Sequence, residues 1–331
     1  MSFFSKIISF LFFFKFLIFN SVFASTPNVN FETWLSSYKK IALKKGISQE
    51  TIDVAFKNVK FIEQVIKYDR KQPEFFEDTI TYVNKRANIS RVKTARRLLG
   101  KNRLLFTEVE NKFSVEKEIL LALWGIETNF GKHVGKMDII SSLATLSYDK
   151  RRRDFFSSQL LTLLKLIDDK LLDPNTLYGS WAGAYGNFQF MPSTISRYAI
   201  DYDNNNKIEL KFSLDDSLAS AANYINRIGW KKSQPCFFRV KLTNKIKDKY
   251  INTSARKISN RLKINKWKKK GVVNFDGTDL KTNLRAALIL PDGKPDTPAF
   301  LVFENYEKIL KWNRSLRFGI SVCTLADMIK A

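Results

Sequence analysis

The most informative stretch of the chain is an apolar segment ending in a single acid, SVEKEILLALWGIETNFG, at residues 114–131. Its opening serine is a typical helix cap, and the apolar residues after it predict a buried helix over 115–126. Glu127 follows, flanked by Trp124 and Phe130. Aromatic neighbours desolvate a carboxylate and raise its pKa toward a value suited to a general acid. A solvated or ion-paired glutamate at a helix end is the alternative interpretation.

Helical periodicity continues over most of the chain around this segment. The predicted helices cover 31–45, 48–57, 89–99, 154–171, 213–229 and 317–330. After Trp230 the pattern becomes that of strands, because 236–242 alternates and 286–290 and 299–303 flank a Pro-Asp-Gly turn as a hairpin. The predicted fold class is therefore α+β, mainly α.

The composition excludes several kinds of site. The chain has 331 residues but one histidine and two cysteines, Cys236 and Cys323. This set cannot supply a structural zinc tetrad, an iron–sulfur cluster or a CxxC redox pair, and it disfavours Ser-His-Asp chemistry. Carboxylates remain for acid–base work. The two cysteines can form a disulfide outside the cytoplasm, but their spacing alone does not show that they meet.

The formal net charge is +24, from 56 Lys and Arg against 32 Asp and Glu. Such a charge is compatible with a polyanionic partner. The basic residues are scattered along the sequence, however, and no nucleic-acid-binding motif accompanies them. We therefore expect no nucleic-acid partner.

The N-terminus has the pattern of a secretory signal. An apolar stretch over 7–19 follows Lys6, and Val22 and Ala24 occupy the two positions where signal peptidase reads small residues. We expect cleavage after Ala24. An uncleaved inner-membrane anchor is the alternative, but Lys15 leaves the stretch short of the ~20 apolar residues that span a bilayer.

A second informative segment is rich in glycine, GSWAGAYGNFQFMPS, at residues 179–193. Glycines allow the backbone to approach a ligand closely, and Ser180, Asn187 and Gln189 offer polar groups. Its aromatic residues are suited to stacking on sugars, but they fit a hydrophobic core equally well.

A third segment, DYDNNNKIE at 201–209, resembles the start of an EF-hand calcium loop, with oxygen side chains at positions one, three and five. Position twelve is Phe212 rather than the usual glutamate, and the next acids are Asp215 and Asp216. Metal binding and a plain polar turn are both compatible with this pattern.

Taken in order, these segments closely resemble the lytic murein transglycosylases of the membrane-bound B type, which are lysozyme-like enzymes that cleave peptidoglycan. The main run of similarity extends from Ala122 to Trp230. The motifs that carry it are LATLSYD at 143–149 with RRR at 151–153, the glycine-rich segment, YAID at 198–201 and ANY at 222–224, with fainter matches in QPEF at 72–75, WNRS at 312–315 and LAD at 325–327.

The resemblance implies that Glu127 is the single catalytic acid and base. It would cleave the bond between N-acetylmuramic acid and N-acetylglucosamine and leave a 1,6-anhydromuramoyl end. Two-carboxylate glycosidases need a second acid, whereas assistance by the substrate's acetamido group removes that need. A muramidase that hydrolyses the same bond and a non-catalytic peptidoglycan-binding protein are the alternatives.

The resemblance also implies the remaining site residues. It assigns substrate contacts to Ser180, Gln189, Tyr224, Asn313, Tyr82, Arg151 and Arg152. It assigns a structural calcium ion, with no organic cofactor, to Asp201, Asp203, Asn205, the Lys207 carbonyl and Asp216. The chain departs from the family in having Trp312 and Phe318 where tyrosines are usual.

The domain organisation that follows is a signal peptide, a helical N-terminal lobe, a lysozyme-like catalytic core with the EF-hand-like loop, and a small mixed α/β region with a C-terminal return to the groove. Their predicted bounds are 1–24, 25–113, 114–230 and 231–331. We expect a periplasmic monomer that acts on peptidoglycan glycan strands and has no membrane span once the signal is removed.

Overall fold

The computed structural model describes residues 30–71 and 77–331. The predicted signal peptide at 1–24 and the QPEF motif at 72–75 therefore lie outside the described residues. None of the helices in the two described ranges combines the length and hydropathy that a membrane crossing requires.

Helices dominate the described part of the chain. They are α1 (Phe31–Lys44), α2 (Gln49–Ala55), α3 (Glu63–Arg70), α4 (Thr79–Arg86), α5 (Ile89–Lys101), α6 (Arg103–Phe113), α7 (Lys117–Thr128), α8 (Ile139–Tyr148), α9 (Arg153–Asp168), α10 (Pro192–Tyr198), α11 (Leu214–Arg227), α12 (Ile264–Lys268), α13 (Glu304–Trp312) and α14 (Leu316–Lys330). The predicted mainly helical α+β class is confirmed, as are the helices predicted at both ends of the chain.

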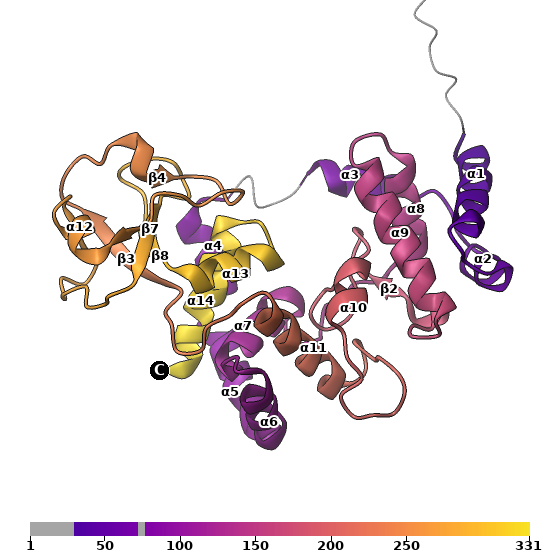
Figure 1. Ribbon diagram of the computed structural model, residues 1–331, viewed down its shortest axis with the longest axis horizontal. Helices are drawn as coiled ribbons and strands as arrows, with labels where there is room; N and C mark the ends of the chain where they lie inside the picture. The colour runs from indigo at the N-terminus through magenta and orange to yellow at the C-terminus, as the bar shows by residue number, and fades with distance from the viewer. Residues whose placement is uncertain (1–29, 72–76) are drawn as a thin grey trace, which may run out of the picture.

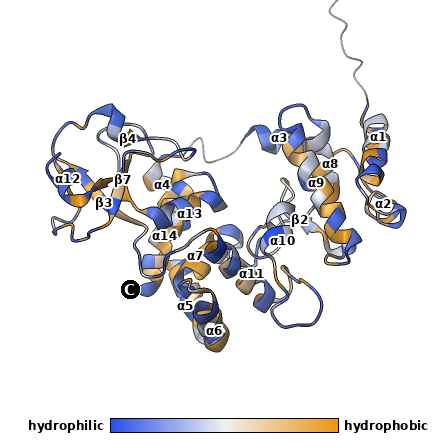
Figure 2. Ribbon diagram, in the orientation of Figure 1, coloured by the Kyte–Doolittle hydropathy of each residue, from blue (hydrophilic) through white to orange (hydrophobic). Residues whose placement is uncertain are grey.

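Helix α7 lies near the middle of the molecule, where α5, α6, α11 and α14 contact it (Figure 1). On the other side, α1, α2 and α3 pack against α8 and α9. Residues of the predicted N-terminal lobe thus contribute to both groups of helices, and the domain bounds stay a prediction. Hydrophobic and hydrophilic residues alternate along most of these ribbons, as expected for helices with one buried face (Figure 2).

The strands lie mainly in the last third of the chain. They are β1 (Met137–Asp138), β2 (Tyr178–Gly179), β3 (Phe237–Leu242), β4 (Ile251–Asn252), β5 (Leu262–Lys263), β6 (Val272–Asn274), β7 (Arg285–Ile289) and β8 (Ala299–Val302). The larger sheet has the order β4-β7-β8-β3-β6, with β5 also paired to β7. Strands β7 and β8 are antiparallel with Leu288 opposite Leu301, which confirms the predicted hairpin.

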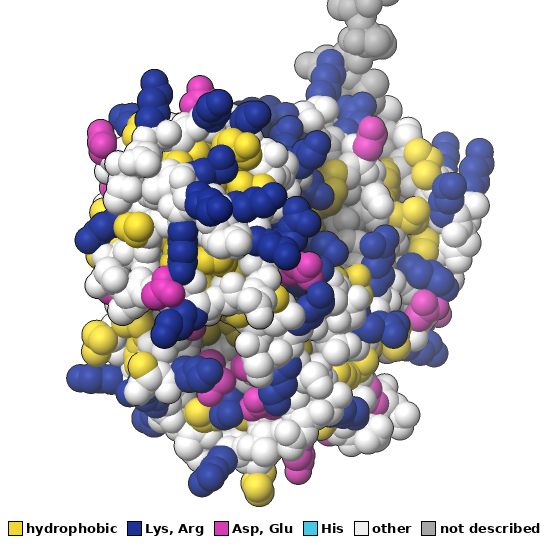
Figure 3. All heavy atoms as spheres, turned by 60° about the vertical axis from the view of Figure 1, so that its left-hand side comes forward, with side chains coloured by type: hydrophobic (Ala, Val, Ile, Leu, Met, Phe, Trp, Pro, Cys, Tyr) yellow, Lys and Arg dark blue, Asp and Glu magenta, His cyan; other side chains and the backbone are white. Residues whose placement is uncertain are grey.

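This sheet has a core of its own, centred on the fully buried Trp267, and is tied to the helical part by a disulfide. The bond joins Cys236, just before β3, to Cys323 in α14. The sheet region is also strongly basic, because residues 237–303 contain 16 Lys and Arg against five Asp, a net +11 of the chain's +24. Lys and Arg side chains crowd the face in Figure 3. The expectation of evenly scattered charge is therefore wrong, because nearly half of the net charge lies in this region.

Two predicted helix boundaries are correct and two are wrong. Ser48 and Ser213 cap α2 and α11, each accepting a hydrogen bond from the backbone N–H three residues on. Ser114 instead ends α6 in a left-handed conformation, with φ of 53°, and α7 begins after Glu116. Helix α5 continues through Gly100, where no neighbour lies within 4 Å of an added Cβ, because an exposed glycine weakens a helix without having to end it.

Candidate active site

Glu127 lies in the last turn of α7, a helix whose other residues are mostly buried. The carboxylate itself is half-buried. The helix ends at Asn129 with φ of 50°, and Phe130 follows with φ of 60° and folds its ring back over Gly125. A Cβ at Gly125 would lie 2.7 Å from that ring, so only glycine allows this sharp turn next to the acid.

The aromatic side chain that hydrogen bonds to Glu127 is Trp312, at the end of α13. Its indole Nε1–H donates to Glu127 Oε1 at 2.9 Å. The sequence pointed instead to Trp124 and Phe130, but the indole of Trp124 donates to Asn187 Oδ1 at 3.1 Å. Trp312 is 185 residues from Glu127, and its departure from the family pattern was the one local signal that singled it out.

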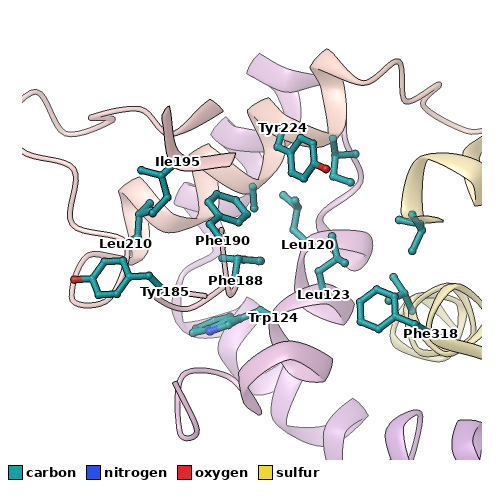
Figure 4. Close-up of a cluster of buried hydrophobic side chains, with 14 of the residues drawn as sticks. Leu120, Leu123, Trp124, Tyr185, Phe188, Phe190, Ile195, Leu210, Tyr224 and Phe318 are labelled. Atoms are coloured by element: carbon teal, nitrogen blue, oxygen red, sulfur yellow. The ribbon is translucent and has the colours of Figure 1, made fainter. Parts of the chain in front are cut away.

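Aromatic side chains form the wall behind Trp312. Tyr224 of α11 stacks on it with ring centroids 5.0 Å apart and planes 25° apart, and Phe190 and Phe188 meet it edge-on at 5.2 and 6.2 Å. Figure 4 shows Phe188, Phe190 and Tyr224 in one cluster with Trp124. The aromatic residues of the glycine-rich segment are therefore core residues beneath the site, except for the half-buried Trp181.

Tyr224 has a defined hydrogen-bond partner in the protein. Its hydroxyl donates to the Lys311 carbonyl at 3.0 Å, immediately before Trp312. Burial raises the pKa of Tyr224 to about 12, so the hydroxyl keeps its proton at neutral pH. Asn313 caps the end of α13 and is half-buried, which brings it beside Trp312. The predicted sugar contacts of Tyr224 and Asn313 stay predictions.

Ser180 and Gln189 are both half-buried in the glycine-rich segment, and the protein holds one end of each side chain. Ser180 Oγ accepts from the Ala182 and Ala184 N–H groups, at 3.3 and 3.0 Å, which leaves its own proton to donate. Gln189, with φ of 50°, donates from Nε2 to the Val134 and Gly186 carbonyls at 3.1 and 3.0 Å. Both side chains are thus oriented by backbone groups.

Asn187, expected among the polar groups that face a ligand, has a structural role instead. It is 7% exposed and accepts from Trp124 in α7, while its side-chain amide donates to the Leu210 and Lys211 carbonyls at 3.3 and 3.2 Å. Thr128 Oγ1 also donates to its backbone carbonyl at 2.8 Å. Asn187 therefore ties α7 to Leu210 and Lys211, which directly follow the acidic loop at 201–209.

The other predicted substrate residues have partners within the protein. Tyr82 in α4 is 2% exposed, and the Arg86 guanidinium lies 3.4 Å from the centre of its ring. Arg151 Nε donates to the buried Asp69 at 2.7 Å, and Arg152 lies 3.6 Å from the same carboxylate. These contacts join α3 to the start of α9, and the predicted substrate roles of the three residues are not tested by them.

The acidic loop brings three carboxylates together. Atoms of Asp201, Asp203 and Asp216 lie within 4.8 Å of one another. Asp216 is fully buried, and its two oxygens accept from the Tyr202 and Glu209 N–H groups at 2.7 and 2.9 Å. The acid that joins the loop is thus Asp216 rather than Asp215.

The electrostatics of this loop favour a cation. Desolvation and the charges of Asp216 and Asp201 raise the pKa of Asp203. Within the described residues, no Lys or Arg forms a salt bridge with any of the three acids. Asn205 adds a side-chain oxygen, which accepts from the Lys207 N–H at 2.9 Å. Clustered oxygen ligands of this kind fit a hard divalent ion such as calcium.

The family of this chain is identified by its match to a known protein-family model. A model of the transglycosylase SLT domain matches residues 30–327. The chain belongs to this family. The resemblance drawn from the motifs around Glu127 is therefore confirmed.

Individual proteins are also similar to this chain. Membrane-bound lytic murein transglycosylase B of Escherichia coli (strain K12) is 41% identical over 121 residues, 36% of this chain and 33% of that protein, so the match spans about a third of the length of this curated relative. SltB3 from Pseudomonas aeruginosa, whose crystal structure was solved in complex with NAG-NAM-pentapeptide, is 35% identical in sequence to this chain. The structural alignment covers 91% of this chain and 80% of the SltB3 chain, with a TM-score of 0.83. The lytic transglycosylase Slt35 of E. coli in complex with calcium has a TM-score of 0.76 over 93% and 94% of the two chains, and at 24% identity it supports the fold alone.

Proposed function

We propose that the protein is a lytic transglycosylase that cleaves the β-1,4 bond between N-acetylmuramic acid and N-acetylglucosamine in peptidoglycan. The observation that carries this proposal is the half-buried Glu127 at the end of α7, held by an indole donor beside a glycine-rich segment with oriented polar groups. The similarity to SltB3, which was solved with a NAG-NAM-pentapeptide, supports the same substrate class. The test is the release of soluble fragments from purified peptidoglycan.

The proposed reaction needs one proton-transferring group. Glu127 donates its proton to the glycosidic oxygen as the bond from this oxygen to C1 of N-acetylmuramic acid breaks, and the bonding electrons go to the oxygen. The C6 hydroxyl of the same sugar then forms a bond to C1 and returns its proton to Glu127. The products are a free 4-hydroxyl on N-acetylglucosamine and a 1,6-anhydro ring. No water is consumed and Glu127 ends protonated, ready for another cycle.

Ser180 and Gln189 are proposed to position the glycan at the bond that is cleaved. Ser180 keeps a hydroxyl proton to donate, and the carboxamide oxygen of Gln189 remains an acceptor while its nitrogen is held by two carbonyls. The half-buried Asn313 offers an amide next to Trp312 for an acetamido group. Tyr224, Tyr82, Arg151 and Arg152 complete the proposed set.

Gln189→Ala is expected to lower turnover of peptidoglycan about tenfold, because positioning by one polar group contributes on the order of 1–2 kcal/mol. Gln49→Ala, a change of the same kind on the exposed face of α2, serves as the control. Steady-state rates of the purified variants check this. If the Gln189→Ala enzyme is as fast as the control, Gln189 does not position the glycan.

We infer that Asp201, Asp203, Asn205, the Lys207 carbonyl and Asp216 bind a structural calcium ion. The fully buried Asp216 and the close packing of three acids support this proposal, and Slt35, with the same fold, was solved with calcium. When bound, calcium would offset two of the three negative charges of these acids. Asn187 links the segment after this loop to α7, so order in the loop also steadies the catalytic helix.

Export to the periplasm is the location that fits this substrate. The expected N-terminus of the mature protein is Ser25, since Val22 and Ala24 fit the cleavage rule. N-terminal sequencing of the protein from its native host tests this. If the protein is found in the membrane fraction with Met1 intact, the N-terminal segment is instead an uncleaved anchor.

A further inference from the structure

The direction of the hydrogen bond between Trp312 and Glu127 is fixed by the chemistry of the indole, which would not be so for a phenol or an amide side chain. An indole N–H donates a hydrogen bond and cannot accept one. Trp312 Nε1 lies 2.9 Å from Glu127 Oε1, so this oxygen serves as the acceptor. A proton placed on the same oxygen would compete with the indole hydrogen.

The indole is held firmly in this orientation. Tyr224 stacks on one face of Trp312, and Tyr198 stacks on the far side of Tyr224 with centroids 4.5 Å apart. The Tyr224 hydroxyl also binds the Lys311 carbonyl, which fixes the end of α13 from which Trp312 projects. A donor held by packing and a second hydrogen bond needs no reorganisation during the reaction.

We propose that Trp312 is a positioning residue that dictates which carboxyl oxygen of Glu127 transfers the proton. The indole keeps Oε1 as an acceptor, so the proton delivered to the glycosidic oxygen and later recovered from the C6 hydroxyl is carried by Oε2. This inference rests on the proposed acid and base role of Glu127. It assigns to Trp312, a departure from the family's usual tyrosine, the task of a donor that cannot also accept a hydrogen bond.

The same bond stabilises the transition state more than the ground state. Hydrogen bonds to a charged acceptor are stronger than those to a neutral one, and Glu127 becomes charged as its proton leaves. The interaction with Trp312 therefore strengthens during bond cleavage, which raises kcat rather than substrate affinity.

Trp312→Phe tests this, because it keeps an aromatic ring against Tyr224 and removes the N–H. With a soluble glycan fragment of peptidoglycan as substrate, we expect kcat to fall about tenfold to a hundredfold with little change in KM. The alkaline limb of the pH–activity profile is expected to move to higher pH, because the variant stabilises the charged carboxylate less. Trp312→Tyr, which restores a donor, is expected to recover part of the loss.

Two ionisable groups on helices that contact α7 are left unchanged by the substitution. Arg91 of α5 donates from Nε to the Gly125 carbonyl at 3.1 Å, and Tyr224 of α11 keeps its proton to a pKa of about 12. Both groups are the same in wild type and variant. The difference between the two profiles therefore reports on the indole.

The chain offers a matched control for the loss of an indole hydrogen bond. Trp230 is 8% exposed and donates from Nε1 to Glu116 Oε2 at 2.6 Å, at the opposite end of α7 from Glu127. Trp230→Phe thus removes the same kind of bond outside the site. It is expected to leave the pH profile and kcat unchanged. Equal losses in the two variants, or a raised KM with an unchanged pH profile in Trp312→Phe, would overturn the proposal.

A measurement without substrate separates this inference from the proposed function. In ¹⁵N-labelled protein, the indole signal of Trp312 is identified as the one that is absent from the spectrum of Trp312→Phe. In wild type this signal is expected to shift as Glu127 titrates. In Glu127→Gln it is expected to lose this pH dependence. If the pH dependence of the indole chemical shift is the same in wild type and Glu127→Gln, the positioning role is contradicted even if the enzyme is active. An inactive wild type with a responsive indole would instead contradict the proposed function alone.

Discussion

Replacing Glu127 with glutamine is expected to lower the rate of peptidoglycan cleavage at least about a thousandfold. General acid and base catalysis each contribute about 10²–10⁴, and here one carboxyl group performs both. Glutamine preserves the size of the side chain and an oxygen that accepts from Trp312, so the fold is expected to remain intact. Turnover of purified peptidoglycan by wild type and variant at equal concentration gives the measurement.

Glu116→Gln is the matched control for this change. Glu116 lies just before α7 and accepts from Trp230 and the Ser233 N–H, far along the helix from the acid at its other end. We expect this variant to keep its activity. A Glu127→Gln enzyme that retains more than a few per cent of the wild-type rate, with contamination excluded, would show that another group is the acid.

Asp216→Ala is expected to lower the free energy of unfolding by about 4 kcal/mol when calcium is present in millimolar excess. The change removes two charge-assisted hydrogen bonds to buried backbone, each contributing about 1.5–3 kcal/mol, together with a calcium ligand. Without calcium we expect a smaller loss, since the variant also relieves repulsion from Asp201 and Asp203. Urea unfolding with calcium and with a chelator provides both values.

Asp215→Ala removes the adjacent acid, which is half-buried in the same helix and does not belong to the cluster. Its stability and its response to calcium are expected to match wild type. If wild type unfolds identically with calcium and chelator, the loop is a polar turn and not a metal site. If Asp215→Ala rather than Asp216→Ala abolishes the calcium response, the ligand assignment is wrong.

Features that depend on neighbouring residues could be predicted from the sequence. Ser48 and Ser213 act within three residues of themselves, and the hairpin around Pro291 joins strands that are close in the chain. Ser114 was misassigned because the same residue can end one helix or begin the next. Helix α6, which ends at Ser114, was not predicted, although Phe106, Val109 and Phe113 recur in it at helical spacing.

Glu127, the proposed acid, and the acidic loop were visible in the sequence, but their partners were not. Trp312 donates to Glu127 because α13 packs on α14, and α14 packs on α7. The choice between Asp215 and Asp216 depended on which side of α11 faces the loop, since adjacent helical residues point about 100° apart. Asn187 was expected to face a ligand. Its structural role was not foreseen, because its partner Trp124 is distant in the sequence.

Mass spectrometry of the products released from purified peptidoglycan tests the central claim most directly. Attack by the C6 hydroxyl consumes no water, so each fragment is expected to end in a 1,6-anhydromuramoyl group and to lack the mass of one water relative to a hydrolysed fragment. Wild type should give this product and Glu127→Gln should give essentially none. Fragments that carry a reducing end with the added water would identify a muramidase, and intact peptidoglycan with bound wild-type protein would identify a non-catalytic binding protein.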